Sequence, residues 1–233
     1  MAYSTAITVS DAHLLHPSDA RTSDFIHFLA SKAARTDLIV LNGDIFDFFV
    51  GAQTAAIDNY AQVIDTIEQA ATQCKLVFVQ GNHDFHLNRV FSPKVEVCDE
   101  WQDVIAGKKV LWIHGDTLAP SITYKLLRNF LRSALVRVIT ETLPSRLVWK
   151  LALAWSNSSR AGSTLSTAET MQALEPSVIE RCANRVDLLV TGHYHLDYRF
   201  LQNGFVWHGL GDWLRDRHYL EINSEGTFGK TYG

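Results

Sequence analysis

The chain has 233 residues, with 21 Lys and Arg against 25 Asp and Glu, and a formal net charge of −4. Its hydrophobic share of 47% is typical of a packed globular domain and excludes a disordered chain. The sequence has no secretory signal and no apolar run that could span a bilayer, and its three cysteines are scattered. These features predict a cytoplasmic protein with reduced thiols and exclude a disulfide framework.

Strand and helix patterns alternate along the first part of the chain. Short apolar runs predict strands at 6–10, 38–42, 76–80 and 110–114, and amphipathic patterns predict helices at about 22–35 and 57–73. A helical block is expected over roughly 121–185, followed by strands at 187–191, 199–202, 205–208 and 217–222. Alternating βαβ units followed by a run of strands predict an α/β sandwich with a mixed sheet, formed as one domain over 1–233.

Five short polar strings each follow one of the predicted strands. They are Asp11-Ala-His13, Gly43-Asp44, Gly81-Asn82-His83-Asp84, His114-Gly-Asp116 and Gly192-His193-Tyr-His195. The carboxyl ends of strands in an α/β sheet are where such proteins gather their sites. A lone Asp after a strand is also typical of a turn, but five such strings in one chain are poorly explained by turns. The pattern therefore predicts a metal centre.

The candidate metal ligands carry imidazole, carboxylate and amide groups but no thiolate. They are Asp11, His13, Asp44, Asn82, His114, His193 and His195. Seven ligands exceed what one ion needs once water is counted, so we expect two ions, with the carboxylate of Asp44 shared between them. This donor set favours Mn, Fe or Zn, and its oxygen share favours Mn²⁺. Two such ions promote in-line displacement at phosphorus and lower the pKa of a bridging water.

The candidate catalytic residues are His83 and Asp84. If the segment is extended, His83 points away from Asn82 and could protonate a leaving oxygen or pair with phosphate charge. Asp84 and Asp116 could orient a metal ligand or a catalytic imidazole, and the role of Asp47 is left open. The other histidines lack this context, although His86 could contact substrate. They are His16, His27, His86, His208 and His218.

The five strings, in this order, resemble the calcineurin-like metallophosphoesterase superfamily. The resemblance implies a four-layer α/β/β/α sandwich in which His83 is the catalytic histidine. It also implies two metal sites: one formed by Asp11, His13, Asp44 and His195, and the other by Asp44, Asn82, His114 and His193.

A narrower resemblance covers most of the chain. Four strings resemble UDP-2,3-diacylglucosamine hydrolases: Gly43-Asp-Ile-Phe-Asp47, Gly81-Asn-His-Asp-Phe85, His114-Gly-Asp-Thr-Leu118 and Leu210-Gly-Asp-Trp213. The implied reaction splits the pyrophosphate of UDP-2,3-diacylglucosamine into UMP and 2,3-diacylglucosamine 1-phosphate, in lipid A synthesis, by metal-hydroxide attack at phosphorus. The chain departs from these enzymes at His83, where the best-known members have Arg, and after His195, where Leu-Asp replaces Arg-Pro. One alternative function is therefore a metallophosphoesterase that acts on another phospholipid or on a soluble phosphodiester or phosphomonoester. A further alternative is a binding scaffold without catalysis.

The helical block combines basic and large apolar residues. Between Ser121 and Arg160 it has seven basic residues against one acid. This pattern predicts a lid over 121–185 that contacts acyl chains and an anionic membrane surface; the alternative is a helical pair packed on the sandwich with a solvated basic face. The candidate substrate-binding residues are Arg128, Arg132, Ser159 and Arg160. We expect a peripheral protein at the cytoplasmic face of the inner membrane, with no nucleic acid and no obligate protein partner.

Overall fold

The computed structural model describes residues 3–118, 122–144, 148 and 167–232. Its larger sheet has six strands in the order β13-β12-β1-β2-β4-β6. They are β1 Ala6–Val9, β2 Leu38–Asn42, β4 Lys75–Val79, β6 Val95–Cys98, β12 His218–Asn223 and β13 Gly226–Thr231. The four strands β1, β2, β4 and β6 run parallel. At one side of the sheet, β12 pairs antiparallel with β1, and β13 pairs antiparallel with β12.

The second sheet has five strands in the order β10-β11-β9-β8-β7. They are β7 Glu100–Ile105, β8 Lys108–Ile113, β9 Leu188–Thr191, β10 Tyr198–Gln202 and β11 Phe205–Gly209. The three central strands run parallel and the two edge strands run antiparallel to them. A small parallel pair, β3 Phe49–Val50 with β5 Asp84–Phe85, lies beside them.

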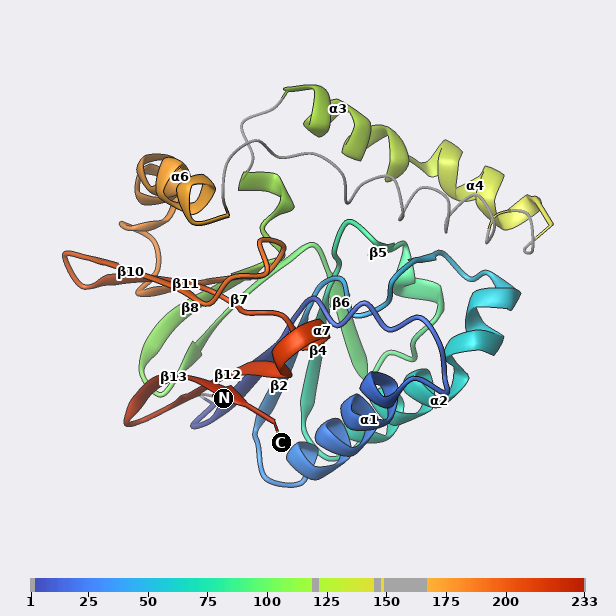
Figure 1. Ribbon diagram of the computed structural model, residues 1–233, viewed down its shortest axis with the longest axis horizontal. Helices are drawn as coiled ribbons and strands as arrows, with labels where there is room; N and C mark the ends of the chain where they lie inside the picture. The colour runs from blue at the N-terminus through green and yellow to red at the C-terminus, as the bar shows by residue number, and fades with distance from the viewer. Residues whose placement is uncertain (1–2, 119–121, 145–147, 149–166, 233) are drawn as a thin grey trace.

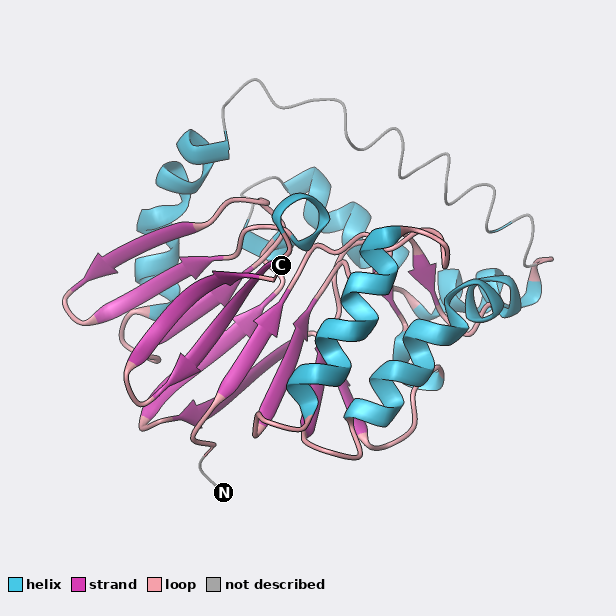
Figure 2. Ribbon diagram, turned by 60° about the horizontal axis from the view of Figure 1, so that its bottom comes forward, coloured by secondary structure: helices cyan, strands magenta, loops and turns pink. Residues whose placement is uncertain are grey.

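The two sheets pack face to face, and helices cover their outer faces (Figure 1 and Figure 2). Along β2, Ile39 and Leu41 pack in the cluster shared with α1 Ala20–Ala33 and α2 Thr54–Ala70, whereas Leu38 and Val40 pack between the sheets. This alternation is the period of two of a strand that is buried on both faces. Helix α6 Thr167–Cys182 covers the other sheet. The predicted four-layer α/β/β/α sandwich is confirmed.

Helix α1 begins two residues earlier than predicted, because Asp19 caps it by accepting a hydrogen bond from the backbone N–H of Arg21. Its buried face repeats at Phe25, Phe28 and Leu29, the spacing that keeps side chains on one side of a helix. Burial of each such side chain stabilises the fold by about 1.5–3 kcal/mol.

Two amphipathic helices, α3 Ile122–Leu131 and α4 Ala134–Thr142, lie over one end of the sandwich (Figure 1). Several of their large apolar side chains are exposed. By contrast, α6, which also falls within the predicted lid range 121–185, is an integral layer of the sandwich. The single-domain boundary and the lid stay predictions. Among the described residues, no helix has the length and apolar character needed to cross a membrane.

Candidate metal centre

The five predicted strings meet at the end of the sandwich where β1, β2, β4, β8 and β9 finish. Five of the seven candidate ligands have a left-handed backbone, with φ between 43° and 70°: Asp11, His13, Asp44, His193 and His195. Each such residue costs about 1–3 kcal/mol, so surrounding contacts must hold it. A cluster of strained backbone of this kind is typical of a functional site rather than of ordinary turns.

The predicted ligands form two groups. Asp11, His13 and His195 form the first, and Nε2 of His195 lies 3.4 Å from Oδ1 of Asp11. Asp44, His114 and His193 form the second.

Asn82 joins the second group, because its Oδ1 lies 3.1 Å from Nε2 of His114. Asp44 lies between the groups, with Oδ2 at 3.3 Å from Nε2 of His114 and 3.9 Å from Nε2 of His13. The structure therefore brings all seven candidates together.

These separations fit bound metal ions. Two donor atoms that each lie about 2.1 Å from one ion are about 3.0–3.4 Å apart, which matches the short gaps here. Imidazole, carboxylate and amide donors suit Mn, Fe or Zn. The residues present could therefore hold two divalent ions that share Asp44.

The charges of the cluster favour cations. Burial alone would raise the pKa of Asp44, but His114, His83 and His13 outweigh it and hold that pKa well below its usual range. Burial, together with the nearby His114, lowers the pKa of His193 to about 4, so this imidazole is neutral and keeps a lone pair for a metal. Burial opposes a charge on His114 as well, yet the carboxylate of Asp44 raises its pKa to about 10. A bound ion would take the place of that proton.

Glycines allow the loops to approach this closely. A Cβ atom at Gly81 would lie 2.1 Å from Oδ1 of Asp44, and one at Gly192 would lie 1.9 Å from Oγ of Ser10. A side chain at either position would displace a metal ligand or its neighbour, because Ser10 donates a hydrogen bond to Asp11 at 2.6 Å. The glycines of the sequence strings therefore serve packing as well as turns.

Backbone and carboxylate partners orient the imidazoles. The Nδ1–H of His114 donates to the carbonyl of Asn42 at 3.0 Å, and Nδ1 of His195 lies 2.9 Å from Oδ2 of Asp212. Both contacts direct Nε2 toward the metal cluster. Nδ1 of His13 lies 3.6 Å from the carboxylate of Asp47, whose role the sequence left open.

His83 lies against the first ligand group. Its backbone N–H donates to Oδ1 of Asp44 at 2.8 Å, and its ring centroid is 5.0 Å from that of His13. The Nδ1–H donates to the carbonyl of Asp47 at 2.7 Å. Nε2 is therefore left for proton exchange or for an ion, and the catalytic role stays a prediction.

Asp84 is fully buried and holds the Asp44 loop. Its carboxylate accepts backbone hydrogen bonds from Gly81 at 2.8 Å, Asp44 at 3.0 Å, Ile45 at 2.7 Å and Phe46 at 3.2 Å. Four such bonds fix the chain around the shared ligand. Its oxygens thus bind backbone, and the catalytic role of Asp84 stays a prediction.

Two of the predicted substrate-binding residues anchor helix α3 instead of standing free. Arg128 pairs with Asp116, and Arg132 donates to the carbonyl of Gly81 at 2.6 Å and pairs with Asp99. Both arginines thus tie α3 to the strings that carry His114 and Asn82. Their contact with substrate stays a prediction. Ser159 and Arg160 lie outside the described residues.

Sequence reasoning assigned no role to Asp212, although its Gly-Asp string after a strand repeats the pattern of Gly43-Asp44. Asp212 is buried, and its Oδ1 also accepts from the backbone N–H of Arg215 at 2.9 Å, which begins the short helix α7 Trp213–Asp216. The helix cap fixes the carboxylate that orients His195.

Asp212→Asn is expected to weaken the affinity for one metal ion by about 10–100-fold, because an amide holds the imidazole of His195 less firmly than a carboxylate does. Isothermal titration of the metal-free protein with Mn²⁺ measures this loss. Asp216→Asn, at an exposed position of the same helix, should bind like the wild type. Equal affinities for the wild type and Asp212→Asn would contradict the role of Asp212.

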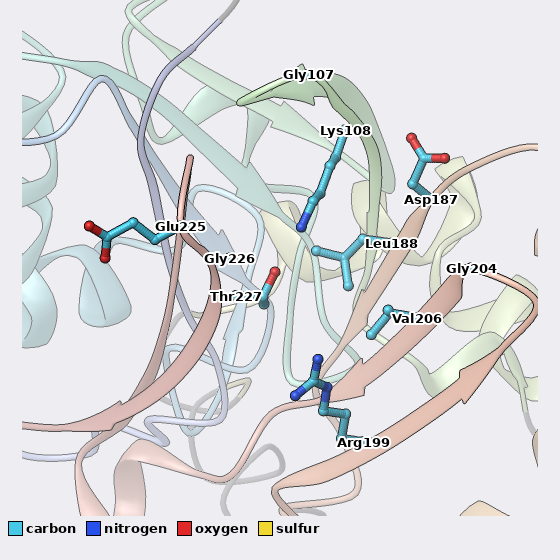
Figure 3. Close-up of a pocket in the computed structure, with 10 residues that line it drawn as sticks. All are labelled: Gly107, Lys108, Asp187, Leu188, Arg199, Gly204, Val206, Glu225, Gly226 and Thr227. Atoms are coloured by element: carbon cyan, nitrogen blue, oxygen red, sulfur yellow. The ribbon is translucent and has the colours of Figure 1, made fainter.

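Figure 3 shows the residues that line a hollow of about 540 Å³. This hollow lies at the opposite ends of the strands from the metal cluster. Lys108 and Leu188, which line it, are the first residues of β8 and β9, whereas the ligands follow the last residues of these strands. Its lining includes none of the seven candidate ligands.

Comparison with known proteins agrees with this geometry. The chain is 27% identical over 231 residues to UDP-2,3-diacylglucosamine hydrolase of Haemophilus influenzae (strain PittGG). The matched region covers 95% of this chain and 96% of that enzyme. The chain is 29% identical over 228 residues to the enzyme of the same name from Histophilus somni (strain 2336), covering 94% and 96%.

A solved structure shares the fold. Vacuolar Protein Sorting 29 from Cryptosporidium parvum matches with a TM-score of 0.50 at 13% identity, covering 99% of this chain and 87% of that one. The sequence profile of calcineurin-like phosphoesterases matches residues 6–197. The chain is therefore a metal-dependent phosphoesterase and belongs to the calcineurin-like phosphoesterase family.

Proposed function

We propose that this protein hydrolyses the pyrophosphate bond of UDP-2,3-diacylglucosamine and releases UMP and 2,3-diacylglucosamine 1-phosphate. The observation that carries the proposal is the position of Asp44 between two groups of ligands, which suits a pair of divalent ions, Mn²⁺ first. Relatives with this activity in their name, at 26–29% identity over nearly the whole chain, support the choice of substrate.

Different residues of the chain would bind the ions and donate the proton. When bound, the two ions neutralise phosphate charge and lower the pKa of a water that attacks phosphorus. Asp44, His114 and His195 would hold the ions in place, because the orientations of these side chains are fixed by their neighbours. Because the Nδ1–H of His83 is donated to the carbonyl of Asp47, proton exchange falls to Nε2. When the imidazole carries both protons, Nε2–H can give its proton to the leaving oxygen and leave a neutral ring.

Incubation of the Mn²⁺-loaded protein with UDP-2,3-diacylglucosamine, followed by mass spectrometry, tests the reaction. UMP and the diacyl sugar 1-phosphate are expected in equal amounts. UDP with the free sugar would show a different broken bond and contradict the proposal. The second candidate function is hydrolysis of another lipid or of a soluble phosphate ester. It would be favoured if no product forms while an aryl phosphodiester is still hydrolysed. His83, which stands where the subfamily has Arg, also favours it.

Helices α3 and α4 support a lipid substrate and peripheral contact with an anionic membrane. Ile122, Leu126 and Phe130 are spaced four residues apart and are 74%, 64% and 57% exposed, which forms one apolar stripe on α3. The exposed Lys125 adds a cation to the same helix. Because α3 is tied to the ligand-bearing strings, a membrane bound here would bring its lipids close to the metal centre. We propose that the enzyme acts at the cytoplasmic face of the inner membrane.

Leu126→Glu is expected to weaken binding to phosphatidylglycerol vesicles several-fold, because it places an anion in the apolar stripe of α3. Sedimentation with vesicles measures the bound fraction. Leu201→Glu is the matched control, since Leu201 is equally exposed at 64% but lies on the edge strand β10. Equal loss for both variants would contradict a membrane surface on α3.

A further inference from the structure

Asp197 joins two buried histidines that the metal cluster does not use. Its Oδ1 lies 3.0 Å from Nε2 of His208, and its Oδ2 lies 3.4 Å from Nε2 of His218. His208 belongs to β11 of the five-stranded sheet and His218 begins β12 of the six-stranded sheet, and their exposures are only 4% and 8%. The exposed carboxylate of Asp197, two residues after the candidate ligand His195, thus hydrogen-bonds His208 of one sheet and lies against His218 of the other.

Two glycines make room for this link. A Cβ atom at Gly229 would lie 2.7 Å from Nε2 of His218, and one at Gly211 would lie 3.0 Å from Cγ of the same ring. A side chain at either position would push His218 away from Asp197. The backbone N–H of His218 also donates to the carbonyl of Asp212, at 3.3 Å. The contact is thus built from both sheets and connects with the carboxylate that orients His195.

The segment that ends at Asp197 needs such support. It carries His193 and His195, whose φ values are 70° and 54°. Two left-handed residues in one short loop cost about 1–3 kcal/mol each. At its start, the backbone N–H of His193 donates to the carboxylate of Asp11 at 3.0 Å. At its far end, the carboxylate of Asp197 contacts His208 and His218.

We infer that Asp197, held by His208 and His218, is a positioning residue that keeps His193 and His195 in place for metal binding. The inference rests on the proposed function, because it gives a role to residues behind the proposed metal centre. Among the residues that the structure describes, no hydrogen bond or ion pair joins Asp197 to a candidate ligand. Its effect must therefore pass through the loop backbone, and it should change metal affinity more than chemistry at saturating metal.

Asp197→Ala in the full chain tests this role. We expect the affinity for Mn²⁺ to fall by about 10–100-fold, the loss that removing a supporting partner of a metal ligand causes. Turnover should fall at limiting Mn²⁺ and return toward the wild-type value at excess Mn²⁺. Isothermal titration and a Mn²⁺ titration of activity measure both effects. Glu225→Ala, which removes an exposed acid on the β12–β13 turn, is the charge-matched control and should behave as the wild type.

A double-mutant cycle with Asp212→Asn adds a readout that a general loss of stability would not produce. If both carboxylates act on His195, the combined loss of Mn²⁺ affinity should be smaller than the product of the separate losses. Asp197→Asn, which keeps one acceptor oxygen, should retain part of the affinity and guards against a variant that does not fold. A lowered melting temperature with unchanged Mn²⁺ affinity would overturn the inference and leave the proposed function intact. A wild-type chain that binds no divalent ion would overturn both.

Discussion

Asp44→Asn is expected to lower turnover by at least about 10³-fold. The reason is that Asp44 is the carboxylate nearest to both ligand groups, 3.3 Å from Nε2 of His114 and 3.9 Å from Nε2 of His13. Charge stabilisation by a metal ion contributes several kcal/mol to such reactions, and each 1.4 kcal/mol is worth about tenfold in rate. Steady-state kinetics with an aryl phosphodiester, together with metal analysis of the purified variant, measures the loss.

The matched control for this variant is Asp58→Asn, which removes the same charge from an exposed position on α2. It should keep both the wild-type rate and the wild-type metal content. If Asp44→Asn retained two ions and a rate within tenfold of the wild type, Asp44 would not be the shared ligand.

His83→Ala is expected to lower turnover by about 10²–10⁴-fold while both ions stay bound, because it removes a general acid and not a ligand. The carbonyl of Asp47 holds Nδ1 of this imidazole, so the reactive position is Nε2. Metal content and turnover of the same preparation separate the two roles. His27→Ala, on the exposed side of α1, is the control and should match the wild type in both.

The structure supplies an alternative for His83 that this experiment decides. His83 groups with His13 and Asp44 closely enough for the three to hold one ion. If His83→Ala emptied a metal site, His83 would be a ligand. A second assay of His83→Ala uses a substrate with a very good leaving group. Such a substrate does not need a proton donor, so the variant should recover much of the wild-type rate only if His83 is the acid.

The clustering of the candidate ligands could be predicted because each follows a strand with a short apolar run. Parallel strands buried on both faces have the strongest sequence pattern in a sandwich, and their ends must meet at one edge. The glycine before Asp44 and the glycine before Asn82 strengthened the prediction. The local pattern could not show that Asp11, His13 and Asp44 take up a left-handed backbone, since contacts from other strands hold them there.

Five strands were not predicted from the sequence, and all lie at sheet edges: β6, β7 and β13 at the edges of the two large sheets, and β3 and β5, which form the small two-stranded pair. An edge strand exposes more of its side chains, so its alternation of apolar and polar residues is weak. β13 reads Gly-Thr-Phe-Gly-Lys-Thr, in which only Phe228 is large and apolar, and it forms through pairing with β12. Tertiary pairing, not local propensity, determines such strands.

The supporting residues of the site were the least predictable. Asp212 orients His195 across 17 residues of sequence and Asn42 orients His114 across 72, so only the fold brings each pair together. Arg128 and Arg132 were predicted from charge alone, and the structure pairs them with Asp116 and Asp99. A count of basic residues does not show which of them are already paired.

The most direct test of a shared two-metal centre is an anomalous diffraction map from crystals of the protein soaked in Mn²⁺, recorded at the manganese absorption edge. Two peaks are predicted, one among Asp11, His13 and His195 and the other among Asn82, His114 and His193, with Asp44 between them. A single peak, or peaks that do not lie on either side of Asp44, would contradict the account.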